Sequence, residues 1–202
     1  PTGYYYTTVS GTTAYIGAIA PMGRDLWGAY RVTANATLGS TTLTNVSSFT
    51  GIQVGQLITG TGMAAGTTIV SFDAVAMTID VSLAATANAT ATAYTVPTGS
   101  IRVETIGSAP NRIHVIQHKN FSRFATANEL MNFQIRLYEG SSTIEIMYGA
   151  NSTLSTTTNP QVGLRGTANS DFNNRTGTDW SASTAGGTNS ATMTYATTSV
   201  PA

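Results

Sequence analysis

The fold class is decided by one stretch of sequence, Asn132-Phe133-Gln134-Ile135-Arg136-Leu137-Tyr138-Glu139-Gly140-Ser141-Ser142-Thr143-Ile144-Glu145-Ile146-Met147-Tyr148. In its first part Phe133, Ile135 and Leu137 alternate with polar residues, which is the period-two pattern of a strand with one buried face. Residues 139–142 read Glu-Gly-Ser-Ser, which is typical of a hairpin turn between two such runs. We therefore predict two antiparallel strands, at 132–138 and 143–148.

Similar alternation recurs along most of the chain, and no stretch has the apolar spacing of a convincing helix. Two further strands are expected before the hairpin, at 101–106 and 112–117. Shorter strands are expected in a region rich in Thr, Ala and Gly, at 41–46, 56–59, 67–72, 76–81 and 91–96. Many short strands separated by glycine-containing turns indicate an all-β protein built as an antiparallel β-sandwich.

The composition is unusual in its scarcity of charge. Charged residues make up 9% of the 202 residues and the formal net charge is +0, whereas an average soluble protein has about 25% charged residues. A free monomer usually stays soluble through a charged surface with a net charge away from zero. The surface is therefore expected either to be covered by neighbouring subunits or to be an extracellular surface of Thr and Ser, and both readings point away from a cytosolic enzyme.

Several classes of partner are disfavoured by the same composition. Nucleic acids and anionic membranes are bound through basic patches, and this chain has no basic excess. Cysteine is absent, so no disulfide, zinc–thiolate cluster or thiol nucleophile is available. No apolar run approaches the ~18 residues of a membrane-spanning helix. Because the sequence opens on Pro1 without a Met, we expect it to be processed or to be part of a longer sequence.

The few charges are unevenly distributed along the chain. Residues 33–99 contain no Lys or Arg, and Asp73 and Asp80 are their only acids. We predict that residues 34–98 form an inserted β module, rich in Thr, Ala and Gly, which interrupts a host domain made of residues 1–33 and 99–202. The alternative is a long decorated hairpin within a single sandwich.

Outside this charge-poor window, four segments carry a recognisable pattern. They are Ala18-Ile19-Ala20-Pro21 with Asp25-Leu26, then Gly107-Ser108-Ala109-Pro110-Asn111-Arg112-Ile113-His114-Val115-Ile116-Gln117-His118-Lys119-Asn120-Phe121, then the hairpin at 132–149, and finally residues 161–166 with 171–176. In this order they resemble the nidogen-like extracellular domain, in the version found in secreted surface proteins of Bacteroidetes. His118 stands where that family often has Trp. The resemblance implies adhesion or assembly outside the cell, and it supplies no catalytic residues. Residues 55–70 resemble a small β module that recurs in phage virion proteins and bacterial surface proteins.

A sandwich that is short of an N-terminal strand suggests how subunits are linked. An exposed sheet edge is a template for an added strand, and donor-strand complementation uses such an edge. We expect residues 2–16 to pair with a neighbouring subunit; the alternatives are that they pair within their own sheet or that the chain is truncated. The interface candidates, rich in aromatic and aliphatic side chains, are Tyr4, Tyr5, Tyr6, Val9, Tyr15 and Ile16.

Metal sites are not expected from the two histidines. His114 and His118 lie four residues apart in an expected strand, where a rise of ~3.3 Å per residue separates them by about 13 Å, too far for one zinc ion. The best ion candidate is a loop with oxygen ligands at Asp171, Asn173 and Asp179, which would suit structural calcium. Such residues are also ordinary loop formers, so no cofactor is expected.

No constellation in the sequence indicates an enzyme. The nine acidic residues show no spacing typical of a glycosidase pair, and no nucleophile elbow or phosphate-binding loop is present. Glu139 and Glu145 flank the hairpin and are expected to pair across strands with Arg136 or Arg112.

The sequence therefore predicts a secreted structural subunit of an extracellular filament or cell-surface assembly, whose main partner is further copies of itself. The alternative is a monomeric adhesin or carbohydrate-binding module of a larger secreted protein, which would bind surface glycans or other surface proteins. A virion decoration protein is a third, weaker reading.

Overall fold

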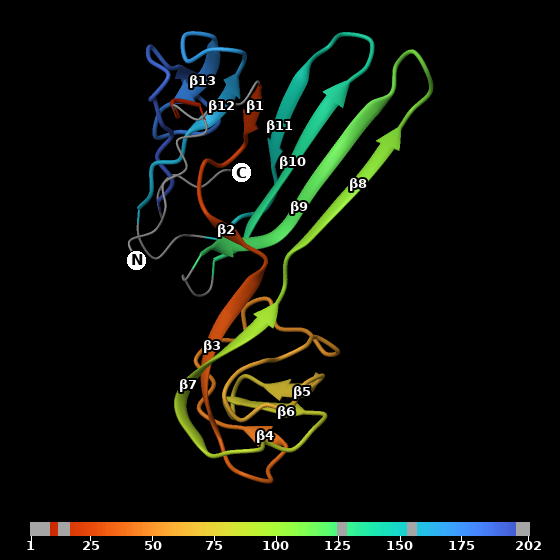
Figure 1. Cartoon of the computed structure of the whole chain (residues 1–202), viewed down its shortest axis with the longest axis vertical. Helices are drawn as coiled ribbons and strands as arrows, with labels where there is room; N and C mark the ends of the chain where they lie inside the picture. The colour runs from red at the N-terminus through yellow and green to blue at the C-terminus, as the bar shows by residue number, and fades with distance from the viewer. Residues whose placement is uncertain (1–8, 12–16, 125–128, 153–156, 197–202) are drawn as a thin grey trace. The chain divides into compact units, whose positions relative to one another are not determined.

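The computed structural model describes residues 9–11, 17–124, 129–152 and 157–196. Within these residues every regular element is a β-strand and eight strand pairs run antiparallel, which confirms the predicted all-β, sandwich-like fold (Figure 1). The chain forms two compact units. The first contains residues 1–26, 100–119 and 129–202, and the second contains residues 27–99 and 120–128. No helix in the described ranges is long and apolar enough to cross a membrane.

The first unit contains a four-stranded antiparallel sheet. Its strands, in spatial order, are β1 (Ala18–Ala20), β12 (Val162–Arg165), β13 (Phe172–Thr176) and β14 (Thr184–Ala185). In the register of the first three strands Ile19 lies opposite Leu164, and Leu164 lies opposite Asn173. Cross-strand partners point to the same face of a sheet, so these three side chains share one face.

A second sheet contains the hairpin that decides the fold class. Its spatial order is β11 (Ile144–Tyr148), β10 (Met131–Tyr138), β9 (Ile113–Arg123) and β2 (Leu26–Trp27), and β8 (Ser100–Ile106) also pairs with β9. All four strands expected at 101–148 are therefore confirmed, and the one expected at 112–117 continues six residues further, to Arg123. The predicted turn is present too, and it is closed by a hydrogen bond from Tyr138 N to Thr143 O at 3.0 Å.

The second unit is built from two small sheets. β3 (Ala29–Ala36) pairs with β7 (Ala89–Pro97), and β6 (Thr78–Val81) lies between β4 (Thr42–Leu43) and β5 (Ile69–Asp73). Its core is almost wholly aliphatic, with fully buried side chains that include Leu43, Ile58, Ile69, Ile79 and Tyr94. Four of the five strands expected in the charge-poor window are found here, and the one expected at 41–46 is shortened to Thr42–Leu43.

The expected strand at 56–59 is the exception. Leu57 and Thr59 make only isolated bridges, to Thr68 and Thr95. Gly55 and Gly60 flank the segment with φ values of +88° and +157°, and backbone in that region turns the chain away from an extended path.

The unit that holds the charge-poor window is larger than the window. β3 runs without a break through the expected boundary at Thr33, and its pairing with β7 begins at Ala29 and Pro97. The unit therefore begins at Trp27 and also takes in residues 120–128. The pairing of β3 with β7 sets the start of this unit, and the charge-poor window begins six residues later, at Thr33.

Candidate functional site

β11 is the last strand of its sheet. Its hydrogen bonds to β10 can be assigned from both ends: Tyr138 N donates to Thr143 O at 3.0 Å, and Gly149 N donates to Asn132 O at 2.9 Å. In an antiparallel pair, residues that exchange hydrogen bonds alternate with residues that do not. The two flanking bonds therefore fix which peptide groups of β11 face β10 and which face away from it.

The peptide groups of Glu145 and Met147 face β10, opposite Arg136 and Gln134. The N–H and C=O groups that face the other way belong to Ile144, Ile146 and Tyr148. Among the residues that the structure describes, no strand pairs with that side of β11. Within the described part of the chain β11 thus has a free edge, which is a row of backbone donors and acceptors able to bind another strand.

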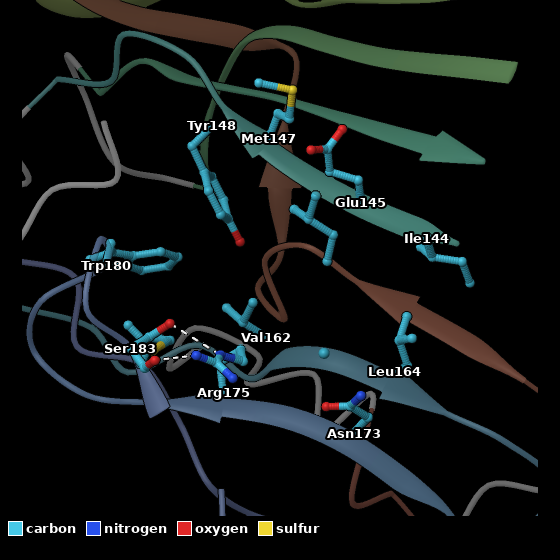
Figure 2. Close-up of a pocket in the computed structure, with 13 residues that line it drawn as sticks. Ile144, Glu145, Met147, Tyr148, Val162, Leu164, Asn173, Arg175, Trp180 and Ser183 are labelled. Atoms are coloured by element: carbon cyan, nitrogen blue, oxygen red, sulfur yellow. Dashed lines mark hydrogen bonds between the residues drawn. The ribbon is translucent and has the colours of Figure 1, made fainter. Parts of the chain in front are cut away.

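A cavity of about 520 Å³ lies between this free edge and the four-stranded sheet (Figure 2). Its lining comes from β11, β12, β13 and the chain that follows them: Ile144, Glu145, Ile146, Met147, Tyr148, Val162, Gly163, Leu164, Asn173, Arg175, Trp180, Ser183 and Met193. In Figure 2 the side chains of Val162 and Leu164 point up toward β11, whereas those of Glu145 and Met147 point away from the cavity.

A second cavity of about 570 Å³ adjoins the first and shares Ile144, Leu164 and Asn173 with it. It extends the space along β12 to β1, at residues 17–19, and to residues 171–173. We call the two cavities together the β11 groove.

The walls of the β11 groove combine polar and apolar side chains. Val162 is buried, Ile19 and Leu164 are half-buried, and Ile144 is 38% exposed. In a closed sandwich the inner faces of the two sheets interdigitate and bury such residues. The partial exposure of these side chains shows that the two sheets of this unit are not closed on each other here.

One end of the β11 groove is formed by aromatic rings. Trp180 packs edge-on against Tyr148, with ring centroids 4.9 Å apart, and against Tyr195 at 5.9 Å. Trp180 Nε1 donates to Thr194 O at 2.7 Å, and the Tyr148 hydroxyl donates to Pro21 O at 2.5 Å. Burial raises the pKa of the Tyr148 hydroxyl, which therefore stays protonated and acts as a donor.

Arg175 places a guanidinium in the lining of the groove. Its Nε donates to Ser183 Oγ at 3.1 Å, and its Nη2 donates to the backbone carbonyl oxygen of Ser183. Ser183 thereby orients Arg175 on the sheet face that also carries Val162 and Asn173. The groove thus offers apolar side chains, a backbone edge and two cationic side chains, because Arg165 lines the second cavity.

The profile of the NIDO-related family matches residues 69–201, which is more than half of the chain. The chain belongs to the NIDO-related family. No curated protein and no solved structure matches it significantly. The NIDO-related match covers every strand that lines the β11 groove except β1. It also includes residues 69–98, which the sequence analysis assigned to an inserted module.

The residues expected at a subunit interface lie mostly outside the described part of this NIDO-related chain: Tyr4, Tyr5, Tyr6, Tyr15 and Ile16. Val9 is described and fully buried, and its N–H donates to Gln161 Oε1 at 2.9 Å. Val9 therefore packs within its own subunit, and the interface itself stays a prediction.

The expected ion loop is divided in the structure. Asp171 and Asn173 line the second cavity, whereas Asp179 lines neither cavity. Asp179 Oδ1 instead accepts hydrogen bonds from Ser181 N and Ser181 Oγ, at 2.9 and 2.7 Å, which lower the pKa of its carboxyl group. In the described ranges no three His, Cys, Asp or Glu side chains are grouped to hold a metal ion. The expectation of no cofactor and its alternative, structural calcium at this loop, both stay predictions.

The histidines lie on β9, as expected. His118 stacks on Phe133 with ring centroids 4.6 Å apart, and burial lowers its pKa. His114 Nδ1 lies 2.9 Å from Thr105 Oγ1.

The predicted cross-strand ion pairs are both confirmed. Arg112 pairs with Glu139, and Arg136 Nη1 lies 3.6 Å from Glu145 Oε2. All four residues therefore have structural partners.

Sequence reasoning did not find the β11 groove. Residues 161–166 and 171–176 were recognised for their family resemblance, but not as two paired strands that face β11. The alternation of Val162 and Leu164 around Gly163 was a usable local signal for a strand. Nothing local indicates which strand its exposed face lies against.

Proposed function

We propose that this chain is a structural subunit of an extracellular filament or cell-surface assembly, which self-associates through β-strand pairing. The observation that carries the proposal is the edge of β11 that no other described strand covers, beside a groove whose walls include partly exposed apolar side chains. Main-chain hydrogen bonds to such an edge provide affinity, and pockets for alternate side chains provide specificity. Natural proteins usually protect edges of this kind, so an open edge next to partly exposed apolar side chains favours an intermolecular role.

Exposed apolar side chains support the proposal. On β8, Ile101 and Val103 are each 58% exposed, and in the second unit Val54 and Val75 are 64% and 95% exposed. The low charge content and the zero net charge leave little electrostatic repulsion between copies. Contact between subunits would remove such apolar surface from water.

The extracellular location is supported by the family, because NIDO-type domains are typically extracellular, and by a surface rich in Thr and Ser. We extend the proposal to a surface protein of the Bacteroidetes type in which residues 34–98 are an insertion. As proposed, the assembly requires no catalytic group and no cofactor.

The proposal is tested on the purified chain by light scattering coupled to gel filtration over a wide concentration range, with negative-stain electron microscopy of the same samples. Ordered filaments or regular oligomers that grow with concentration are the expected result. A protein that remains monomeric at every concentration would contradict the proposal.

A second candidate function is a monomeric adhesin or carbohydrate-binding module. It is favoured by the aromatic end of the β11 groove, where Trp180 and Tyr148 lie beside Arg175, because aromatic rings with polar edges suit sugar surfaces. A glycan array distinguishes the two functions. Binding by a monomer that is lost in Trp180→Phe and Trp180→Ala variants, while both variants stay folded, would support the adhesin.

A further inference from the structure

We infer that β8 pairs with β8 of a second copy of this chain, antiparallel and about a two-fold axis at Val103. This contact joins the sheets of two subunits edge to edge. It goes beyond the proposed function, because that function rests on the free edge of β11 and this contact uses a different strand with its own symmetry.

β8 lies at the rim of its sheet, next to β9 (Figure 1). Within the described part of the chain, no strand pairs with its other side. All residues from Ile101 to Ile106 are exposed, and Ile101 and Val103 are each 58% exposed. A strand of seven residues with one unpaired side is a template for a further strand.

The hydrogen bonds of β9 determine which peptide groups of β8 face outward. Glu139 N donates to Arg112 O at 2.9 Å, so the peptide groups of Arg112 face β10. This direction alternates along an antiparallel strand, so the peptide groups of Val115 face β8, opposite Glu104. Along β8 the even-numbered residues therefore face β9, and the N–H and C=O groups of the odd-numbered residues face outward.

These outward groups match those of a second copy when the two strands pair about Val103. Val103 then lies opposite Val103 of the second copy, and Ile101 lies opposite Thr105 of the second copy. All three residues have outward peptide groups, so each of their N–H groups meets a C=O group of the other copy. Residues 101–105 of the two copies thus form one hydrogen-bonded ladder.

The charged side chains of β8 favour the same register. Arg102 and Glu104 lie on the face of the strand opposite to Val103. In the paired strands Arg102 of each copy lies opposite Glu104 of the other, at a non-hydrogen-bonded position, where side chains approach most closely. Opposite charges at such a position stabilise the pair. Within the described residues, neither side chain has an ion-pair partner in its own chain.

The same two side chains disfavour the neighbouring registers. The smallest shift that keeps the outward peptide groups paired places either Arg102 opposite Arg102 or Glu104 opposite Glu104. Like charges directly opposite each other destabilise an antiparallel pair. The segment Ile101-Arg102-Val103-Glu104-Thr105 is therefore complementary to itself when Val103 lies on the two-fold axis.

The other face of β8 contributes apolar surface to the contact. Ile101 and Val103 lie on this face, where Val103 is opposite Ile116 of β9. Pairing brings Ile101 and Val103 of both copies together and removes part of their surface from water. The formal net charge of +0 adds no long-range repulsion between the copies.

The symmetry of the contact determines what it can build. A two-fold contact uses the same surface on both subunits and closes on itself, so β8 alone gives a dimer. β8 and β11 lie on opposite sides of β9 and β10. A second contact at the free edge of β11 would extend the sheet from dimer to dimer, which is the geometry that a filament requires.

Disulfide cross-linking tests the register, because the chain has no cysteine of its own. In the paired strands the two Val103 Cα atoms lie about 5.5 Å apart, within the span of a disulfide. The two Ile101 Cα atoms are offset by four residues, or about 14 Å at ~3.4 Å per residue. Ile101→Cys is therefore the matched control for Val103→Cys, since both residues lie on one face and are equally exposed.

Under mild oxidation with oxidised glutathione, Val103→Cys should form a disulfide-linked dimer in much higher yield than Ile101→Cys does alone. A mixture of Ile101→Cys and Thr105→Cys should cross-link, because these positions lie opposite each other. Equal dimer yields from Val103→Cys and Ile101→Cys, measured on a non-reducing gel, would overturn the pairing.

Charge reversal gives an independent test in solution. Arg102→Glu places only acids opposite acids, and Glu104→Arg places only bases opposite bases. Each variant should self-associate about tenfold or more weakly than wild type. A mixture of the two variants restores both opposite-charge pairs and should associate, as should the double variant Arg102→Glu with Glu104→Arg. Analytical ultracentrifugation of the folded proteins measures these affinities.

Lys119→Glu is the control for net charge. Lys119 is exposed on β9, and its replacement changes the net charge by the same amount as Arg102→Glu does. We expect Lys119→Glu to self-associate like wild type. Equal weakening by Lys119→Glu and Arg102→Glu, or a double variant that associates no better than the single variants, would overturn the pairing.

The results also separate this contact from the proposed function. Oligomers that grow with concentration but are insensitive to charge reversal and do not favour the Val103→Cys disulfide would overturn the β8 contact and leave the proposed function standing. A charge-sensitive dimer that forms this disulfide and never grows further would support the β8 contact and contradict the proposed filament.

Discussion

The Arg112 guanidinium and the Glu139 carboxylate form an ion pair between the segment that enters β9 and the turn that follows β10. Arg112 Nε donates to Glu139 Oε2 at 2.9 Å, and the Arg112 backbone N–H donates to the same oxygen at 3.2 Å. Glu139 N also donates to Arg112 O at 2.9 Å. Side-chain and backbone bonds thus join the ends of two strands at one point, which fixes their register.

This pair predicts an acid-sensitive contribution to stability. Hydrogen bonds from Arg112 lower the pKa of Glu139 to about 2, whereas an unfolded Glu titrates near about 4.3. A lowered folded pKa stabilises the native state above the unfolded value, and the contribution is lost as pH falls from about 4.3 through about 2. Glu139→Gln should therefore be less stable than wild type at pH 7, with a difference that shrinks toward pH 2. Urea unfolding at several pH values measures it. Because both side chains are exposed, high salt should reduce the difference too.

Tyr148 predicts the opposite behaviour at alkaline pH. Burial raises the pKa of its hydroxyl above that of an unfolded tyrosine, which is about 10. Wild type should therefore lose stability above about pH 10 by up to about 1.4 kcal/mol per pH unit more than Tyr148→Phe does. At pH 7 the same variant should be less stable by about 1–3 kcal/mol, because Pro21 O loses its donor. The prediction would be contradicted if the free energies of unfolding of the two proteins changed equally with pH from pH 9 to pH 11.

His118 predicts a loss of stability on mild acidification. Burial against its surroundings, which include the ring of Phe133, lowers its pKa, so the unfolded chain takes up a proton first, near about pH 6.5. A lowered folded pKa means that stability is present above that value and falls as pH decreases toward the folded pKa. His118→Leu should therefore lose less stability than wild type between pH 7 and pH 5. Thermal unfolding of both proteins at several pH values measures this difference. An equal loss of stability in wild type and His118→Leu between pH 7 and pH 5 would contradict this prediction.

Position 51 in the second unit has no room for a side chain larger than that of glycine. A Cβ atom at Gly51 would lie 2.1 Å from Cε2 of Tyr30, a fully buried ring, and the φ value of Gly51 is +71°. Gly55 has a similar φ of +88° but open space around the same position. Gly55→Ala should therefore cost about 1–2 kcal/mol for backbone strain alone. Gly51→Ala should cost about 1–3 kcal/mol more, because the ring must also move. Chemical unfolding of both variants measures the difference. Equal losses of unfolding free energy would contradict the prediction, because they would show that the Tyr30 ring moves aside at no cost.

The sequence was sufficient for features that depend on neighbouring residues. The alternation in 132–138, the Glu-Gly-Ser-Ser turn and the two ion pairs of Arg112 and Arg136 are local or lie across one hairpin, and all appear in the structure. The strand expected at 56–59 failed because alternation alone does not reveal that Gly55 and Gly60 bend the backbone. Charge composition likewise does not reveal that β3 continues through Thr33 to Ala36.

The sequence by itself therefore determined the all-β class, the central hairpin, the scarcity of charge and the family resemblance. Only the tertiary structure decided that β11 is an edge strand and that its free edge faces Val162 and Leu164 across a groove. The physical reason is that alternation specifies which side of a strand is apolar but contains no information about which strand lies beside it. A free edge is a property of that arrangement, and no residue of β11 carries it alone.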